Sequence, residues 1–222
     1  MINNTRGLVY MGKAEHEKSV AAYQEVMKLA EGKNDPKLND VLSKTYGNLG
    51  GVYFQLGQMD KALETTKKCL ALSETIKDTT DIALNHLRLA MIYNTTDQLD
   101  DGIHHLSEAR LFFKNLNNKA MLVHAENGLG KNFEKKGELE KAFSHYNTAH
   151  EIAKDLGQQE EYISTLLAMA NIKLAQSQIT ESKNYAEDAL AYAKKNGFAN
   201  SEKQAYDLLY RIALTNKQTK QA

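Results

Sequence analysis

Apolar residues recur along this chain with a step of forty residues. The clearest column contains Leu49, Leu89, Leu129, Met169 and Leu209. Small residues follow one position later, and aromatic residues follow three positions after those: Gly50, Ala90, Gly130 and Ala170, then Tyr53, Tyr93 and Phe133. Because small and large positions keep the same register through successive units, the pattern indicates an internal repeat.

Each repeat predicts two helices. The first helix of a unit has apolar or small residues at i, i+3, i+4 and i+7, which share one helix face, here Tyr46, Leu49, Gly50 and Tyr53. Gly57 can adopt a positive φ and end this helix, and Asp60 adds negative charge near the start of the next helix. One hairpin cannot bury such a face alone, so stacked neighbours must complete the core. The predicted fold class is all-α, an α-solenoid of antiparallel helix pairs.

Stop signals between the units set the expected boundaries. The clearest is Asp35 before Pro36, an N-cap residue followed by proline at the first helical position. We expect a single repeat domain over 1–215 and a polar tail over 216–222. The domain is expected to hold about five helical hairpins and a C-terminal capping helix, with approximate ranges of 1–34, 35–77, 78–117, 118–157, 158–197 and 198–215.

Composition excludes several classes of protein. Lys and Arg number 28 and Asp and Glu number 28, so the chain carries no formal net charge, which disfavours a nucleic-acid binder. The single cysteine excludes a disulfide scaffold and a multi-cysteine metal site. The start of the chain lacks a basic and apolar leader, and its apolar runs fall far short of the roughly 20 residues that span a bilayer. We therefore expect a cytoplasmic protein without membrane insertion.

Candidate catalytic and metal-binding residues do not converge. His104 and His105 are adjacent, and adjacent helical residues diverge by about 100°. His145 and His150 are also poorly spaced for one helix face, and Cys69 lies in a column of small residues, where a buried packing thiol is expected. The sequence therefore predicts no enzymatic activity, no metal site and no cofactor.

At these repeat positions the sequence resembles the tetratricopeptide repeat (TPR) family, whose motif is matched best in the second unit by Tyr46, Leu49, Gly50, Tyr53, Gly57, Ala62 and Cys69. Two turns depart from the motif, with Asp97 and Ser177 in place of the turn glycine. The forty-residue period is longer than the family's commonest period of about 34 residues. It is similar to the long repeats of kinesin light chains, Rap-type regulators and the sensory regions of bacterial kinases.

The resemblance implies a right-handed superhelix that binds a protein or peptide on its concave surface, which the first helices line. It places nine residues of this chain in that groove: Phe54, Leu84, Leu87, Met91, Asn127, Lys131, Asn171, Leu174 and Arg211. Within this set, asparagine amides can bond a peptide backbone, and the cations can bind carboxylates. Gly47 and Gly51 also face the groove by analogy, where they either leave room for a ligand or simply loosen the helix.

The leading interpretation is a non-enzymatic protein- or peptide-binding scaffold. The alternative is a sensory or dimerisation segment of a bacterial signalling regulator whose output domain is absent. Homo-oligomerisation stays open, and the sequence does not identify the partner.

Overall fold

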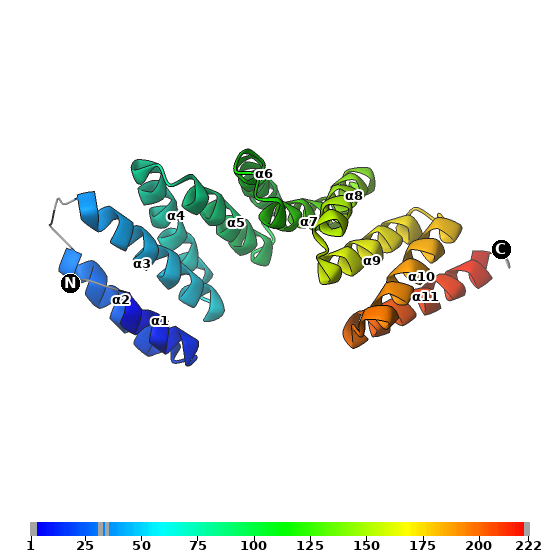
Figure 1. The fold of residues 1–222 in the computed structure, drawn as a ribbon, viewed down its shortest axis with the longest axis horizontal. Helices are drawn as coiled ribbons and strands as arrows, with labels where there is room; N and C mark the ends of the chain where they lie inside the picture. The colour runs from blue at the N-terminus through cyan, green and yellow to red at the C-terminus, as the bar shows by residue number, and fades with distance from the viewer. Residues whose placement is uncertain (1–3, 31–32, 34–35, 220–222) are drawn as a thin grey trace. The chain divides into compact units, whose positions relative to one another are not determined.

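The computed structural model describes residues 4–30, 33 and 36–219 of the chain, and all regular structure in these ranges is helical (Figure 1). The helices are α1 (Thr5–Gly12), α2 (His16–Ala30), α3 (Pro36–Gln55), α4 (Met59–Ile76), α5 (Thr79–Thr95), α6 (Leu99–Asn115), α7 (Lys119–Lys135), α8 (Leu139–Leu156), α9 (Gln159–Ala175), α10 (Ile179–Asn196) and α11 (Ala199–Thr219). Successive helices pair as hairpins, with α11 following the last pair. The predicted all-α solenoid of helical hairpins is confirmed.

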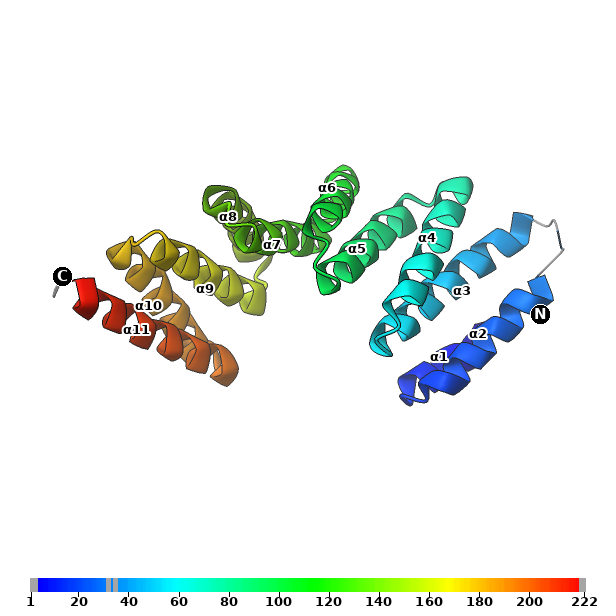
Figure 2. The same cartoon turned by 180° about the vertical axis from the view of Figure 1, so that it is seen from behind.

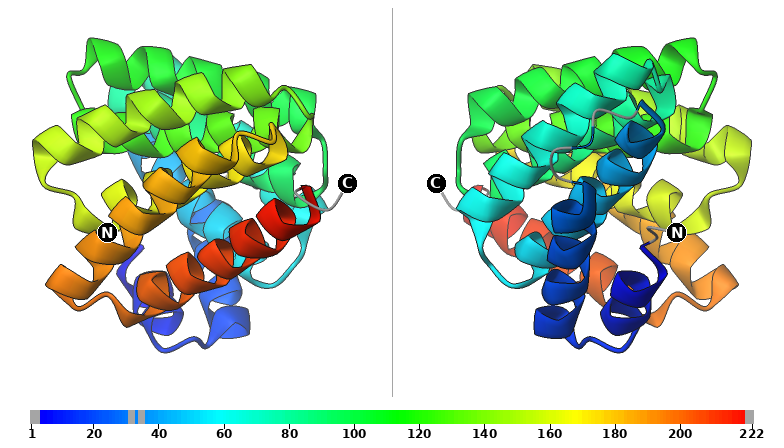
Figure 3. Two further views of the ribbon diagram at one scale, coloured as in Figure 1. Left: turned by 90° about the vertical axis from the view of Figure 1, so that its right-hand side faces the viewer. Right: turned by 90° about the vertical axis from the view of Figure 1, so that its left-hand side faces the viewer.

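The chain divides into two compact units, Met1–Leu116 and Asn117–Ala222. The first unit holds the hairpins α1–α2, α3–α4 and α5–α6, which Figure 2 shows from behind. The second unit holds α7–α8, α9–α10 and the terminal helix α11, which packs against α10 (Figure 3, left panel). The expectation of one repeat domain over 1–215 stays a prediction.

The first helix of a hairpin carries a small residue where the second helix of the same hairpin packs closely against it. A Cβ atom added to Gly130 would lie 2.7 Å from Cε1 of Tyr146, and one added to Gly50 would lie 2.7 Å from Oγ1 of Thr66. In both hairpins the opposing residue lies sixteen positions later in the chain. Sixteen positions after Ala90 comes Leu106, and both are buried. The equivalent positions of this hairpin therefore carry alanine and leucine instead of glycine and tyrosine.

The turns form even where the motif glycine is missing. Asp97 and Ser177 adopt φ values of 60° and 61°, in the left-handed region that Gly57 and Gly137 occupy in the equivalent turns. One backbone hydrogen bond closes each of these turns. The N–H of Gln98 donates to the carbonyl of Tyr93 at 2.8 Å, and the N–H of Gln178 donates to the carbonyl of Lys173 at 2.9 Å. The two departures from the motif therefore add local backbone strain and leave the hairpins unchanged.

The C-terminal boundary corrects one expectation. Helix α11 continues to Thr219, so residues 216–219 of the expected polar tail are helical. The segment contains no glycine or proline to stop the helix, and Thr215 donates from Oγ1 to the carbonyl of Arg211 in the same helix. At the other expected boundary, α3 begins at Pro36, while Asp35 lies outside the described residues.

Within the described ranges, no helix is both long enough and apolar enough to cross a membrane.

The close approach predicts opposite effects for two glycine substitutions. Gly130→Ala should lower the free energy of unfolding by about 1–3 kcal/mol, because the new methyl group overlaps the Tyr146 ring. Gly51→Ala should raise it by up to about 1 kcal/mol, since a Cβ there meets nothing within 4 Å and alanine favours the helix. Urea unfolding followed by circular dichroism measures both.

A double variant separates overlap from a general loss of helix packing. Gly130→Ala combined with Tyr146→Leu reproduces the alanine and leucine pair of the preceding hairpin, so the two changes should compensate each other in a double-mutant cycle. Strictly additive losses would show that the contact with the ring is not the reason for glycine.

Candidate functional site

An apolar pocket lies between the first helices of two successive hairpins in the first unit. It measures about 310 Å³ and is lined from α3, α4 and α5 by Gly50, Gly51, Phe54, Gln55, Thr66, Arg88, Met91 and Ile92. Met91, on α5, is 51 % exposed and presents apolar surface to this pocket. Because a Cβ on Gly51 would contact nothing within 4 Å, the space over this residue belongs to the pocket. We call this site the apolar pocket.

A second cavity lies along the preceding turns of the same helices. This polar pocket measures about 290 Å³ and is lined by Asn4, Leu8, Ser43, Lys44, Gly47, Asn48, Cys69, Asp81 and Arg88. A Cβ on Gly47 would lie 3.3 Å from Nη1 of Arg88 and 3.2 Å from Sγ of Cys69. Because Gly47 has no side chain, Arg88 can lie close to α3. Gly47 and Gly51, the two glycines of α3 placed in the groove by analogy with the family, thus each line a cavity.

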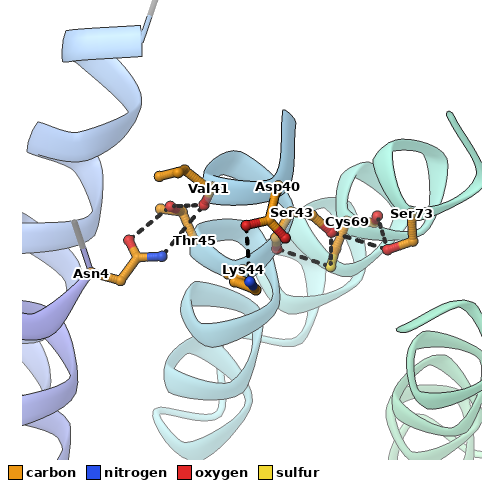
Figure 4. A network of polar contacts seen from close by, with 8 residues as sticks. All are labelled: Asn4, Asp40, Val41, Ser43, Lys44, Thr45, Cys69 and Ser73. Carbon is orange, nitrogen blue, oxygen red and sulfur yellow. Dashed lines mark hydrogen bonds and ion pairs between the residues drawn. The ribbon is translucent and has the colours of Figure 1, made fainter. Parts of the chain in front are cut away.

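A chain of buried hydrogen bonds runs beneath the polar pocket from α3 to α4 (Figure 4). Oγ of Ser43 lies 3.0 Å from Oγ of Ser73, and Ser73 donates to the carbonyl of Cys69 at 3.0 Å. Since Ser73 has one hydroxyl proton, Ser43 is the donor in the first of these bonds. The thiol of Cys69 in turn donates to the carbonyl of Ser43 at 3.1 Å. Cys69 is buried, as predicted for a packing thiol.

The network continues onto α5 and ends at Arg88. Nδ2 of Asn85 donates to Oγ of Ser73 at 3.3 Å, and Nη1 of Arg88 donates to Oδ1 of Asn85 at 2.9 Å. Asn85 has no exposed surface, whereas Arg88 is half-buried and lines both pockets. The buried amide therefore fixes the guanidinium at the junction of the two cavities.

The second unit holds a smaller pocket of about 280 Å³ between α9 and α11, lined by Leu167, Asn171, Gln204, Asp207, Leu208 and Arg211. Nη2 of Arg211 donates to Oδ1 of Asn171 at 3.1 Å, and Nδ2 of Asn171 donates to the carbonyl of Leu167 at 2.9 Å. The structure brings these two predicted groove residues together, and both ends of the asparagine amide are engaged within the protein.

The remaining predicted residues are dispersed. Phe54 and Met91 line the apolar pocket, while Leu84 and Leu87 are half-buried on α5 and line none of the cavities described above. Leu174 packs against the core cluster of α9–α11. Asn127 is half-buried and Lys131 is exposed, both on α7.

Sequence reasoning missed Arg88 and Asn85. The signal for Arg88 is a departure from the repeat, because its forty-residue column otherwise contains Asn48, Gly128, Ala168 and Leu208. A single cation in such a column indicates a role that the other repeats do not share.

Comparison with known proteins settles the family. The family model described as tetratricopeptide repeat matches residues 1–75, 79–155 and 121–195. The chain belongs to the tetratricopeptide repeat family. The sequence resemblance to long-repeat TPR proteins is thereby confirmed, and comparison with curated protein sequences gives no match.

Solved TPR structures share the fold at low sequence identity. BtubC (BKLC) from P. vanneervenii superposes with a TM-score of 0.76 at 22% identity, over 86% of this chain and 78% of that one. The TPR-like repeats of a kinesin light chain-like protein of Podosopora anserina give 0.73 at 14% identity, over 87% and 94%. A Rap protein complexed with Competence and Sporulation Factor gives 0.65 at 13% identity, and the alignment covers 96% of this chain and 64% of the Rap chain.

In two hairpins, a pair of polar side chains connects the first helix to the second at the same position of the repeat. Nδ1 of His86 on α5 lies 2.9 Å from Nδ1 of His105 on α6, and Nδ1 of His145 on α8 lies 2.7 Å from Oε2 of the buried Glu126 on α7. Each pair is separated by 19 residues. Spacing within one helix could not reveal them, since both partners of each pair come from different helices. Among the described residues, no three His, Cys, Asp or Glu side chains are placed to bind a metal.

The two histidines of the TPR hairpin α5–α6 must share one proton between facing nitrogens. Burial lowers the pKa of His86, and burial together with the charges of His86 and His104 lowers the pKa of His105 to about 4. Tyr93 stacks on His105 with ring centroids 5.4 Å apart. The folded hairpin therefore favours the neutral form of both imidazoles.

This preference predicts a loss of stability in acid. The folded-state pKa values lie below the unfolded value of about 6.5, so the unfolded chain binds more protons and the free energy of unfolding falls as pH drops from about 6.5 toward 4. Between pH 7 and pH 5 the pair should contribute about 1 kcal/mol to this fall, a value reduced because His105 is half-exposed. Urea titrations at the two pH values measure the difference.

The matched variants are His105→Gln, which removes the pair, and His124→Gln, which removes an exposed histidine of α7. The pH-dependent loss should shrink only in the former variant. An equal loss in wild type and His105→Gln would contradict the assignment.

Proposed function

We propose that this TPR protein is a non-enzymatic scaffold that binds a protein or peptide on its first-helix faces. The observation that carries the proposal is the apolar pocket between α3 and α5. It combines an exposed Met91, a half-buried Phe54 and the unfilled space over Gly51. Concave, mostly apolar sites of about this size accept a large side chain of a ligand.

Helix propensity supports a role for the open position. Glycine in a helix interior costs about 1 kcal/mol relative to alanine. Gly50 avoids a clash with Thr66, but Gly51 avoids none, so its cost brings no gain in packing. In this proposal, Gly51 is present because it leaves space for a ligand.

The comparisons support the class of partner. TPR proteins are generally scaffolds rather than enzymes, and the Rap structure named above contains Competence and Sporulation Factor. Balanced charges disfavour nucleic acid as the partner. Within this proposal the protein acts in the cytoplasm. The predicted residues Asn127, Lys131, Asn171, Leu174 and Arg211 would contribute from the second unit, and Leu84 and Leu87 from the first.

A second candidate is a sensory or dimerisation segment of a signalling regulator. One observation favours dimerisation: Tyr206, Tyr210 and Leu214 are 47%, 67% and 45% exposed and follow one another at intervals of four along α11. Such spacing forms a continuous apolar stripe. Mass that rises with protein concentration, and falls again in Tyr210→Lys, distinguishes this candidate from a monomeric scaffold.

Filling the apolar pocket tests the leading proposal. Peptides selected from a random dodecamer library against the wild-type chain should lose at least about tenfold in affinity for Gly51→Leu, because the new side chain occupies the space of one buried ligand side chain. Fluorescence anisotropy with labelled peptides measures the affinity.

The control is Gly12→Leu, at another helical glycine where a Cβ meets nothing within 4 Å but which lines neither pocket. Gly12→Leu should bind as wild type does. Undiminished binding by Gly51→Leu, or a library that yields no peptide, would argue against the proposal.

A further inference from the structure

Helix α11 is packed on one face and open on the opposite one. Ala205, Leu208 and Ile212 are at most 3% exposed and belong to the core cluster that α11 shares with α9 and α10. Tyr210 lies two positions from both Leu208 and Ile212, so it points about 160° away from them on a helix of 3.6 residues per turn. Its side chain is 67% exposed. Within the described part of the second unit, no helix covers this face.

The repeat register identifies the open face. Forty-residue steps lead to Tyr210 through a column of small residues, Gly50, Ala90, Gly130 and Ala170. These four residues are buried, and the second helix of the hairpin packs closely on both glycines. Tyr210 therefore lies on the face that a second helix covers in the hairpins. Because its ring replaces a small side chain, a helix can pack here only at a larger distance than in those hairpins.

Exposed residues follow one another on this face with alternating steps of four and three. They are Lys203, Asp207, Tyr210, Leu214 and Lys217. Steps of four and three keep residues on one seam along which two α-helices can pack side by side. The two apolar members, Tyr210 and Leu214, are neighbours on the seam, and charged residues lie on both sides of them.

We propose that this face binds α11 of a second copy of the chain in antiparallel orientation, with the two-fold axis at the level of Ile212. Residues equally far on either side of that level then face each other across the axis. Tyr210 of each copy packs against Leu214 of the other. Asp207 of each copy faces Lys217 of the other.

The charges favour this partner and this register. Asp207 and Lys217 give two equivalent pairs of opposite charge, one on each side of the apolar centre. A two-fold axis at Tyr210 would instead place Lys203 against Lys217 at both ends, and like charges in contact repel. Parallel helices in register would set each charged residue against its own equivalent. Self-complementarity of this kind is what an interface between two identical surfaces requires.

The size of the face predicts a weak dimer. One helix face from each copy is smaller than the interface of a stable complex, which buries about 1,200 Å² or more. The dissociation constant should therefore be on the order of 10–100 µM. This inference does not depend on the apolar pocket, and it gives the dimerisation candidate its surface, orientation and register.

Exchanging the two charges tests the partner and the register together. Asp207→Lys and Lys217→Asp should each weaken self-association by roughly tenfold, because either change turns both opposite-charge pairs into like-charge pairs. The double variant Asp207→Lys/Lys217→Asp restores both pairs and should associate as wild type does. Sedimentation equilibrium of the full chain, from low to several hundred micromolar, measures the dissociation constants.

Two further variants are matched controls. Lys203→Asp changes a charge on the same face, but in this register Lys203 faces no residue of the other α11, so association should be unchanged. With an axis at Tyr210, the same variant would associate more tightly. Tyr210→Ala should abolish the rise in mass with concentration, whereas Leu156→Ala, at a leucine of α8 that is 42% exposed, should leave it unchanged.

The outcomes separate this inference from the peptide-binding proposal. A wild-type chain that stays monomeric at several hundred micromolar would overturn the dimer. A dimer that Tyr210→Ala leaves intact would overturn the surface, and a double charge variant that fails to recover would overturn the register. None of these results changes the expected loss of peptide affinity in Gly51→Leu, and that loss has no bearing on the mass of the chain.

Discussion

The close contact between the two helices of each hairpin is the constraint on which the rest of the structure depends. Gly130 admits the ring of Tyr146, and Gly50 admits Thr66, at the same place in the repeat. This contact fixes which face of the first helix is buried in its own hairpin. The adjoining face is then available to line cavities between first helices of the hairpins and the helices that follow them, as between α3 and α5 and between α9 and α11.

The same register places polar groups with little variation in backbone. Positions 19 residues apart carry a histidine pair in one hairpin and a glutamate with histidine in the next. In the first unit, the buried bonds from Ser43 through Ser73 and Asn85 end at Arg88. A repeat that tolerates such substitutions in fixed places can acquire a specific site at one hairpin without disturbing the others.

The sequence predicted the hairpins because their signals are local: a helical period, a turn and a forty-residue step. Phe54 and Met91, two of the residues placed in the groove from helix register and the family's groove positions, both line the apolar pocket. The site residues that the sequence did not predict depend on contacts between helices. Asn85, which orients Arg88 on α5, is held by Ser73 of α4. The predicted Asn171 is likewise engaged by Arg211 from forty residues away. Such pairings follow from packing that no spacing within one helix encodes.

The most direct test of the account is hydrogen–deuterium exchange of the chain with and without a library-selected peptide. If first-helix faces form the binding surface, peptide should slow backbone exchange in α3 and α5 more than in α4 and α6, because binding stabilises the helices that it contacts. Protection confined to the second helices, or absent from α3 and α5, would contradict the central claim.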